Sequence, residues 1–310
     1  MAISTKTIKR RIKSISNTKK ITKAMEMISA VKMRRAVANV LATRSYANLA
    51  WEMVKEIAQK TNVKHHPLLA RREIKRIGLI LVTSNRGLAG GFSSRLLQEV
   101  HTFIKNSQKE VDLEVDVVLT GRRGKKIYHK FGHTVVAEFE KLDLTTRVEE
   151  ILPMAQMVVK EYMEEKYDKV VVAFMDYVSA INQTPKIKQI LPIEEYDGIT
   201  NTLGVTAPVA DEEITEPIAD DEPVDYGFTF EPNPPEVLEV LLPRLIEMQI
   251  YQAILESDAS EHSARMLAMR NASDAANDMI KELNYSYNKA RQAAITQEIA
   301  EIVGGAAALE

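Results

Sequence analysis

The two ends of this chain lack the residues that interrupt helices, and this constrains the fold more than any other feature. The first proline is Pro67 and the first glycine is Gly78. Residues 236–303 contain a single proline, Pro243, and no glycine. Proline and glycine are the residues least compatible with a helix interior. The sequence therefore predicts one long helix over residues 3–60 and a second over residues 236–303.

An apolar stripe with steps of three and four residues runs along each expected helix. The first stripe contains Ile8, Ile12, Ile15, Ile21, Met25, Ile28, Val31, Ala38 and Leu41. The second contains Leu238, Leu241, Leu245, Met248, Leu255, Ala268, Ala272, Ala275, Met279, Leu283, Ala290 and Ala293. The first helix would be roughly 85 Å long at 1.5 Å per residue, which requires an equally long partner. We expect the two ends to form an antiparallel coiled coil with a thin, alanine-rich seam. Two helices in separate bundles are the alternative.

The middle of the chain alternates between two patterns. Runs rich in Val and Ile predict strands over residues 77–83, 115–120, 134–137 and 169–177. Helical patterns separate them over residues 93–106, 121–131 and 147–166. Strands alternating with helices indicate a mostly parallel, doubly wound sheet. The expected fold class is α/β, with a long antiparallel coiled coil of the terminal helices and a Rossmann-like domain over residues 75–193.

Charge is strongly polarised, although the net charge is only −2. Residues 1–50 hold twelve Lys or Arg and one acid, Glu26. Residues 194–236 hold thirteen Asp or Glu, no base and several prolines. We expect residues 194–235 to be an acidic, extended or mobile insertion that is dispensable for assembly. The expected division of the chain is 1–60, 75–193, 194–235 and 236–310.

Several chemistries are not supported by the sequence. Cysteine is absent, which excludes disulfides, thiolate metal sites and thiol nucleophiles. No run of 18 apolar residues exists, and we expect neither a membrane span nor a secretory signal. The histidines do not form a metal-binding helical pair. They are His65, His66, His101, His129, His133 and His262. We expect no metal, no cofactor and no catalytic residue.

Two glycine-containing turns follow expected strands, over residues 83–91 and 121–126. A doubly wound sheet binds phosphates at such turns. However, neither turn has the spacing of a dinucleotide fingerprint or a P-loop. We interpret both as structural strand-to-helix turns, with a nucleotide-binding enzyme as the alternative.

The basic first helix has three possible interpretations. Twelve positive charges would bind nucleic acid in a salt-dependent way, but residues 1–50 hold one aromatic, Tyr46, which leaves little for base stacking. An acid-poor amphipathic start is also typical of a transit peptide. The third interpretation is a basic helix that passes through a negatively charged protein surface, and we prefer it.

Several ordered runs lie in the two terminal helices and in the turn after the first expected strand, namely TKKITKAMEM (18–27), SNRGLAGG (84–91), SEHSARM (260–266), YNKARQAAITQE (287–298) and EIVGGAAA (301–308). Together these runs resemble the γ subunit of F-type ATP synthase. The resemblance implies a non-catalytic rotor whose coiled coil stands inside a ring of alternating α and β subunits. It also implies that the α/β domain contacts the ε subunit and the ring of c subunits. Proton flow would turn the c ring and this chain with it, at the cytoplasmic face of the cell membrane. No nucleic acid and no small-molecule substrate is implied.

The same resemblance implies roles for individual residues. Met25 corresponds to the position near the β contact that influences coupling. Plausible basic contacts with β are Lys19, Lys20, Lys23, Lys32, Arg34 and Arg35. Arg291 and Gln292 correspond to a pair that hydrogen-bonds a β loop, called the catch, and Thr296 and Glu298 lie in the same run. Glu231 corresponds to the foot beside the c ring.

Overall fold

The computed structural model describes residues 5–60, 66–70, 72–110, 113–128, 135–141, 147–193 and 231–307. The two longest elements are helix α1 (Thr5–Lys60) and helix α5 (Pro234–Ala307), which confirm the two predicted terminal helices. The predicted insertion lies almost wholly outside the described residues. Contacts divide the chain into two compact units, Val31–Ala264 and a unit made of Met1–Ala30 with Arg265–Glu310.

A five-stranded sheet forms the centre of the unit Val31–Ala264. Its order is β3-β2-β1-β4-β5. The strands are β1 (Arg76–Val82), β2 (Glu114–Thr120), β3 (Val135–Phe139), β4 (Lys169–Tyr177) and β5 (Gln183–Leu191). β1 to β4 are parallel, as predicted, and β5 pairs antiparallel with β4.

Strand β5 was not expected from the sequence. Its segment QTPKIKQIL carries Pro185 and two lysines, and most of its residues are only half buried. As an edge strand it can contain a proline, because only one side of its backbone has to pair. The Val- and Ile-rich pattern that revealed the four parallel strands is therefore absent.

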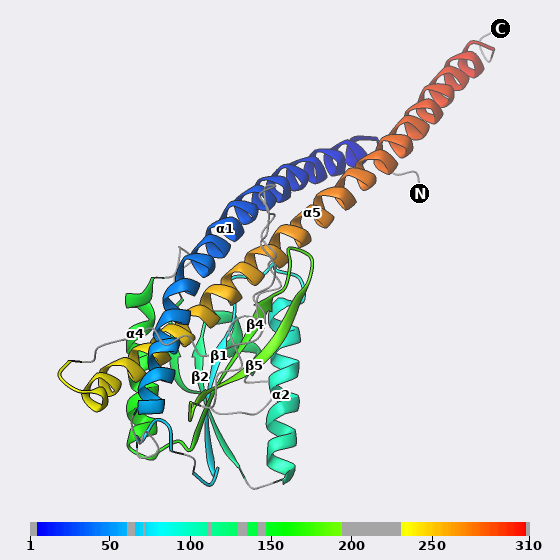
Figure 1. The fold of residues 1–310 in the computed structure, drawn as a ribbon. Helices are drawn as coiled ribbons and strands as arrows, with labels where there is room; N and C mark the ends of the chain where they lie inside the picture. The colour runs from blue at the N-terminus through cyan, green and yellow to red at the C-terminus, as the bar shows by residue number, and fades with distance from the viewer. Residues whose placement is uncertain are drawn as a thin grey trace. The chain divides into compact units, whose positions relative to one another are not determined.

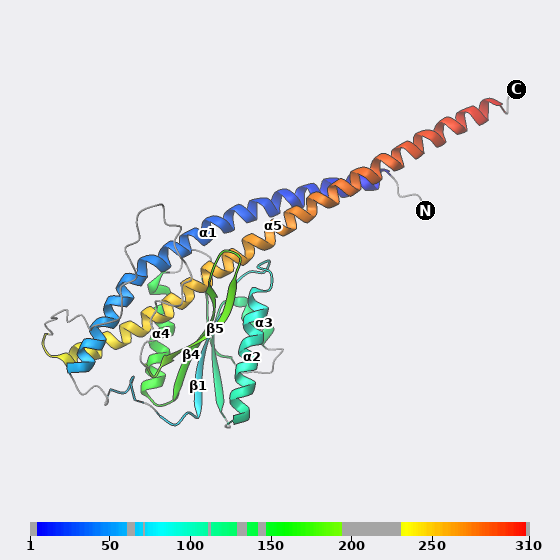
Figure 2. The same cartoon turned by 45° about the vertical axis from the view of Figure 1, so that its right-hand side comes forward.

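Helices cover both faces of the sheet (Figure 1). Helix α2 (Phe92–Glu110) packs Phe92, Leu96 and Val100 on one face. Helix α4 (Val148–Met163) packs on the other face, where the first half of α5 and the second half of α1 complete the same core. Figure 2 shows the short helix α3 (Arg122–Tyr128) beside α2. No helix among the described residues is long and apolar enough to cross a membrane.

The second unit pairs the start of α1 with the end of α5. Lys19 Nζ donates a hydrogen bond to Asn277 Oδ1 at 2.9 Å across the pair. The residues buried in this unit are Ile8, Thr22, Ser29, Arg265, Met269, Ser273 and Ala276. Steps of three, four and seven separate neighbours such as Met269, Ser273 and Ala276, as in a coiled coil.

The predicted seam is confirmed at Ile8, Leu245 and Leu255, which are buried, but it is wrong by one residue at several other positions. Ile21 and Ile28 are 61% and 57% exposed, whereas the adjacent Thr22 and Ser29 are buried. On α5, Met279 is 49% exposed, and Ala276 is buried instead of Ala275. One residue turns a helix by about 100°, so at these positions the more apolar side chains face outward. The seam contains small and hydroxyl-bearing side chains, which let the two backbones approach closely.

This displaced seam predicts opposite behaviour for two neighbouring alanines. Ala276→Leu should overpack the seam and lower the free energy of unfolding of the helix pair by about 1–3 kcal/mol. Ala275→Leu, on the exposed face, should change it by less than about 0.5 kcal/mol. Chemical denaturation followed by circular dichroism measures both. Equal effects of the two substitutions would show that the seam is wrong.

Candidate functional site at the carboxyl edge of the sheet

The carboxyl ends of the parallel strands form the edge at which doubly wound folds bind ligands. The strand order reverses between β1 and β4, so their ends define the crevice. Both glycine-containing turns lie here, after β1 and after β2. The question is whether their backbone donors are available to a phosphate.

In the second turn the chain itself occupies three of those donors. Gly124 N donates to Thr83 Oγ1 at 3.1 Å, and Arg123 N donates to Ser84 O at 3.0 Å. Arg122 N donates to Asn85 Oδ1 at 3.3 Å. The start of α3 is thus bonded to the turn after β1 and does not form an open anion site.

The glycines in the second turn serve this close approach. A Cβ at Gly121 would lie 2.3 Å from Thr83 O, and Gly121 also has a positive φ of +97°. A Cβ at Gly124 would lie 2.4 Å from Leu119 Cδ1 and 2.7 Å from Thr83 Oγ1. The glycines allow two turns of the same chain to meet, which supports the structural interpretation of both.

Helix α5 lies against the rest of this edge. All residues from 250 to 261 are buried, on every side of the helix. Ala259 packs with Tyr177, the last residue of β4. Ser263 Oγ donates to Ala180 O at 2.5 Å, and Gln183 Nε2, at the start of β5, donates to Ser263 Oγ at 3.4 Å. The chain's own helix therefore takes the position that a ligand has in related folds.

A buried ion cluster joins α5 to the segment after β3. Lys141 Nζ pairs with Asp258 and, at 3.2 Å, with Glu261, and all three side chains are less than a tenth exposed. Burial opposes the charge of Lys141, but the two carboxylates outweigh it and raise the pKa of Lys141 above its ordinary value. Asn85 Nδ2 donates to Lys141 O, which ties the first turn to the same cluster.

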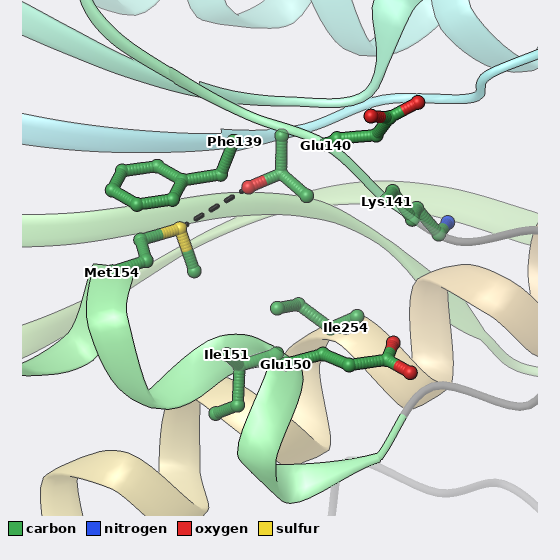
Figure 3. A pocket seen from close by; sticks show the side chains of 8 residues that line it. Phe139, Glu140, Lys141, Glu150, Ile151, Met154 and Ile254 are labelled. Carbon is green, nitrogen blue, oxygen red and sulfur yellow. Dashed lines mark hydrogen bonds between the residues drawn. The ribbon is translucent and has the colours of Figure 1, made fainter.

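A small cavity lies beside this cluster (Figure 3). Its volume is about 20 Å³, enough for little more than one water molecule, whereas ligand pockets span roughly 300–1,000 Å³. Thr120 Oγ1 donates to Met154 Sδ at 3.1 Å across it. A more open hollow of about 320 Å³ lies between α4 and the start of α5, where Lys160 and Glu164 pair with each other at 3.8 Å.

A second buried polar cluster lies on the β4–β5 side of α5. Glu256 accepts a hydrogen bond from Gln252 Nε2 at 3.1 Å and faces Asp176 of β4. Burial first, and then Asp176, raise the pKa of Glu256 to about 8. Lys186 and Lys188 of β5 oppose this shift, and burial lowers the pKa of Lys188. Glu256 Oε2 and Asp176 Oδ1 are buried carboxyl oxygens that lack an assigned donor. A carboxyl group beside a second carboxyl group tends to keep its proton.

These groups hold helix α5 against the sheet. Among the described residues, no three His, Asp or Glu side chains gather in a way that could hold a metal ion. The charged side chains at this edge pair with one another between α5 and the ends of the strands. Sequence reasoning missed this site, since Lys141 and Glu261 are separated by 120 residues.

Most of the residues expected to contact partners lie elsewhere, on exposed faces of the two long helices. Arg291, Gln292, Thr296 and Glu298 are exposed on α5, and Lys20, Lys23, Arg34 and Arg35 are exposed on α1. Lys19 and Met25 are half buried, and Glu231 is exposed just before α5. Lys23 pairs with Glu26 at 2.9 Å, and Thr296 Oγ1 donates to the carbonyl of Gln292 at 3.0 Å. The first 30 residues and residues 265–310 share one unit, so both ends supply expected partner-contact residues to the same helix pair.

The fold and this edge define a class of protein. Such a protein has two long terminal helices and an α/β unit, and one of those helices, here α5, occupies the edge of the sheet at which related folds bind ligands. A family profile described as ATP synthase matches residues 4–309. The ATP synthase gamma chain of Chloroflexus aurantiacus is 41% identical over 309 residues, which cover 99% of each chain. That of Legionella pneumophila (strain Corby) is 38% identical over 304 residues, covering 98% of this chain and 99% of the relative. The chain belongs to the ATP synthase gamma-chain family, whose members are non-catalytic rotor components of F-type ATP synthase.

Solved structures show the same fold. The rotor of the Euglena gracilis mitochondrial ATP synthase, in rotational state 1, aligns with a TM-score of 0.60 at 15% identity, covering 94% of this chain and 98% of that one. A chain from the central stalk and c ring of the Tetrahymena thermophila enzyme aligns with a TM-score of 0.57 at 19% identity, covering 82% and 99%.

The carboxyl pair predicts a pH dependence of stability. Between the ordinary pKa of a glutamate, 4.5, and about 8, folded Glu256 keeps a proton that the unfolded chain has lost. Stability should therefore fall as pH rises through this window, by up to about 1.4 kcal/mol per pH unit, and level off above it. Urea unfolding at several pH values measures the slope.

Glu256→Gln keeps the shape but removes the titration, so its slope should be shallower. Glu114→Gln, at an exposed carboxylate that pairs with Arg76, is the matched control and should keep the native slope. An unchanged slope in Glu256→Gln would show that this group does not titrate in the window.

Proposed function

We propose that the helix pair of α1 and α5 turns inside a ring of alternating α and β subunits, while the α/β unit contacts the ε subunit and the c ring. The observation that carries this proposal is the pairing of the two chain ends in a chain similar to gamma chains over nearly its whole length. A shaft that favours different β conformations at different angles couples rotation to nucleotide affinity. The closed crevice is consistent with a chain that leaves catalysis to the β subunits.

The catch is the most specific residue assignment in this proposal. Residues 291–304 are exposed on all sides of α5. Apolar side chains in this stretch are also exposed, namely Ile295, Ile299, Ile302 and Val303. Such a surface suits a helix end that a ring of partner subunits surrounds. We assign Arg291 and Gln292 to hydrogen bonds with a β loop, with Thr296 and Glu298 beside them.

The bases of α1 separate into two groups by their own contacts. Lys19 bonds to Asn277 within the seam, and Lys23 pairs with Glu26. Lys20, Arg34 and Arg35 are exposed, so we assign them first to acidic β loops, with Met25 at the edge of the same contact. Exposed ion pairs contribute about 0–1 kcal/mol each. Several weak pairs suit a rotor, because no single angle is then strongly preferred.

The assignments near the c ring and the membrane rest on the resemblance to γ subunits. We propose that Glu231 belongs to the foot beside the c ring and that the complex sits at the cytoplasmic face of the cell membrane. The division into 1–60, 75–193, 194–235 and 236–310, and a dispensable acidic insertion, stay predictions. Deleting residues 200–222 should leave assembly intact.

Co-purification tests the function directly. The tagged full-length chain, expressed in its host, should bring down α, β and ε subunits together with ATPase activity. Recovery of the chain without those subunits would contradict the proposal.

The catch assignment predicts loss of coupling. Arg291→Ala with Gln292→Ala removes the two side chains that we assign to hydrogen bonds with the β loop. A hydrogen bond to a charged group such as Arg291 contributes about 1.5–3 kcal/mol. Proton pumping per ATP hydrolysed should therefore fall several-fold in membrane vesicles. Lys281→Ala with Glu282→Ala, at exposed positions of the same helix, is the control and should pump normally. Full coupling in the first variant would show that the catch is wrongly assigned.

A further inference from the structure

In a rotor, torque that enters the α/β unit has to pass into α5. This requires that α5 does not rotate about its own axis relative to the sheet. Up to Leu255, helix α5 packs large side chains such as Ile250 and Ile254 in the core. In the last turns before Arg265 its core residues are the small Ala259 and Ala264, which resist rotation of the helix poorly by shape alone. Directional contacts are therefore needed. The structure provides them on two sides of the helix.

The first set of contacts holds α5 from the β3 side. Asp258 and Glu261 bind Lys141, two residues beyond the end of β3. The two acids are three residues apart and share one side of the helix. Lys141 cannot follow a rolling helix easily, because its backbone carbonyl is bonded to Asn85 in the turn after β1.

The second set holds α5 from the β5 side. Ser263 bonds to Ala180 O and to Gln183, in the turn between β4 and β5 and at the first residue of β5. Glu256 faces Asp176 of β4. Ser263 and Glu256 are seven residues apart, so they share a side of the helix.

The two sets lie on opposite sides. At about 100° per residue, Ser263 lies roughly 170° around the helix from the midpoint of Asp258 and Glu261. β3 and β5 are the two opposite edges of the sheet. A roll of α5 in either direction would strain both sets at once. Both sets lie just before Arg265, where α5 leaves this unit.

We propose that Lys141, Asp258 and Glu261 on one side, and Gln183 and Ser263 on the other, form a two-sided torsional clamp that fixes α5 against rotation about its own axis. This inference rests on the proposed rotor function and adds the place where torque enters the shaft. These are positioning residues. They set the torsional stiffness of the rotor and not the rate of chemistry on β.

The test uses the assembled complex with a bead on the α/β unit, held in one nucleotide-locked state. Angular fluctuation of the bead reports torsional stiffness. One variant replaces the ion cluster with apolar residues (Lys141→Met, Asp258→Leu, Glu261→Met), because such replacement of a buried cluster often preserves stability. A second carries Gln183→Met with Ser263→Ala, and a third combines all five changes.

The combined variant should show about a two-fold or larger rise in angular variance, with each one-sided variant in between. Unloaded ATPase activity should stay native. Arg76→Gln with Glu114→Gln, which removes an exposed cross-strand pair of the same unit, is the control and should keep the native variance. If the combined variant does not assemble, the two variants that each remove one set of contacts provide the test. Native angular variance in both of them would overturn the proposed clamp.

A covalent rescue separates the clamp from a general loss of packing. The chain has no cysteine, so Ala180→Cys with Ser263→Cys introduces a single possible disulfide at one contact. In the ion-cluster variant, oxidation should return the variance toward native and reduction should raise it again. No response to oxidation, with the disulfide shown by mass spectrometry, would also overturn the proposal. If the native complex shows no rotation at all, the rotor function fails and not the clamp.

Discussion

The structure depends on the burial of one stretch of helix α5 at the carboxyl edge of the sheet. Residues 250–261 are buried on every side and include Glu256, Asp258 and Glu261. Buried carboxyl groups are costly unless they are paired or protonated. Lys141 pairs with Asp258 and Glu261, and burial and the neighbouring Asp176 raise the pKa of Glu256, which favours its protonated form. The same segment closes the crevice that would otherwise bind a ligand, so the interaction that secures the fold also removes a possible active site.

This arrangement explains why a doubly wound sheet is present in a chain without catalysis. The fold supplies strand ends at one edge and turns that approach them closely. Here Gly121 and Gly124 let two turns bond to each other, and the turns then support Lys141. A rigid edge of this kind gives a long helix a firm surface to pack against. A gamma chain needs such a surface, because its helices must transmit rotation over many turns.

The sequence was sufficient for the large elements and insufficient for the contacts between them. The absence of proline and glycine predicted both long helices, and runs of Val and Ile predicted four parallel strands. Strand β5 escaped because Pro185 and its lysines are tolerated at an edge. The predicted coiled-coil seam was wrong at Ile21 and Ile28, because the prediction chose the more apolar residues. The smaller Thr22 and Ser29 are the buried ones. The charged cluster could not be inferred, because nothing local in the sequence marks a pairing between Lys141 and Glu261.

The central claim is that this chain turns as one body while the catalytic subunits stay fixed. Single-molecule observation of the assembled complex, with the β subunits attached to a surface and a marker on an exposed residue of α2, tests it most directly. The account predicts stepwise rotation of the marker in one direction when ATP is added, and none without ATP. Sustained ATP hydrolysis by complexes whose marker keeps a fixed angle would contradict it.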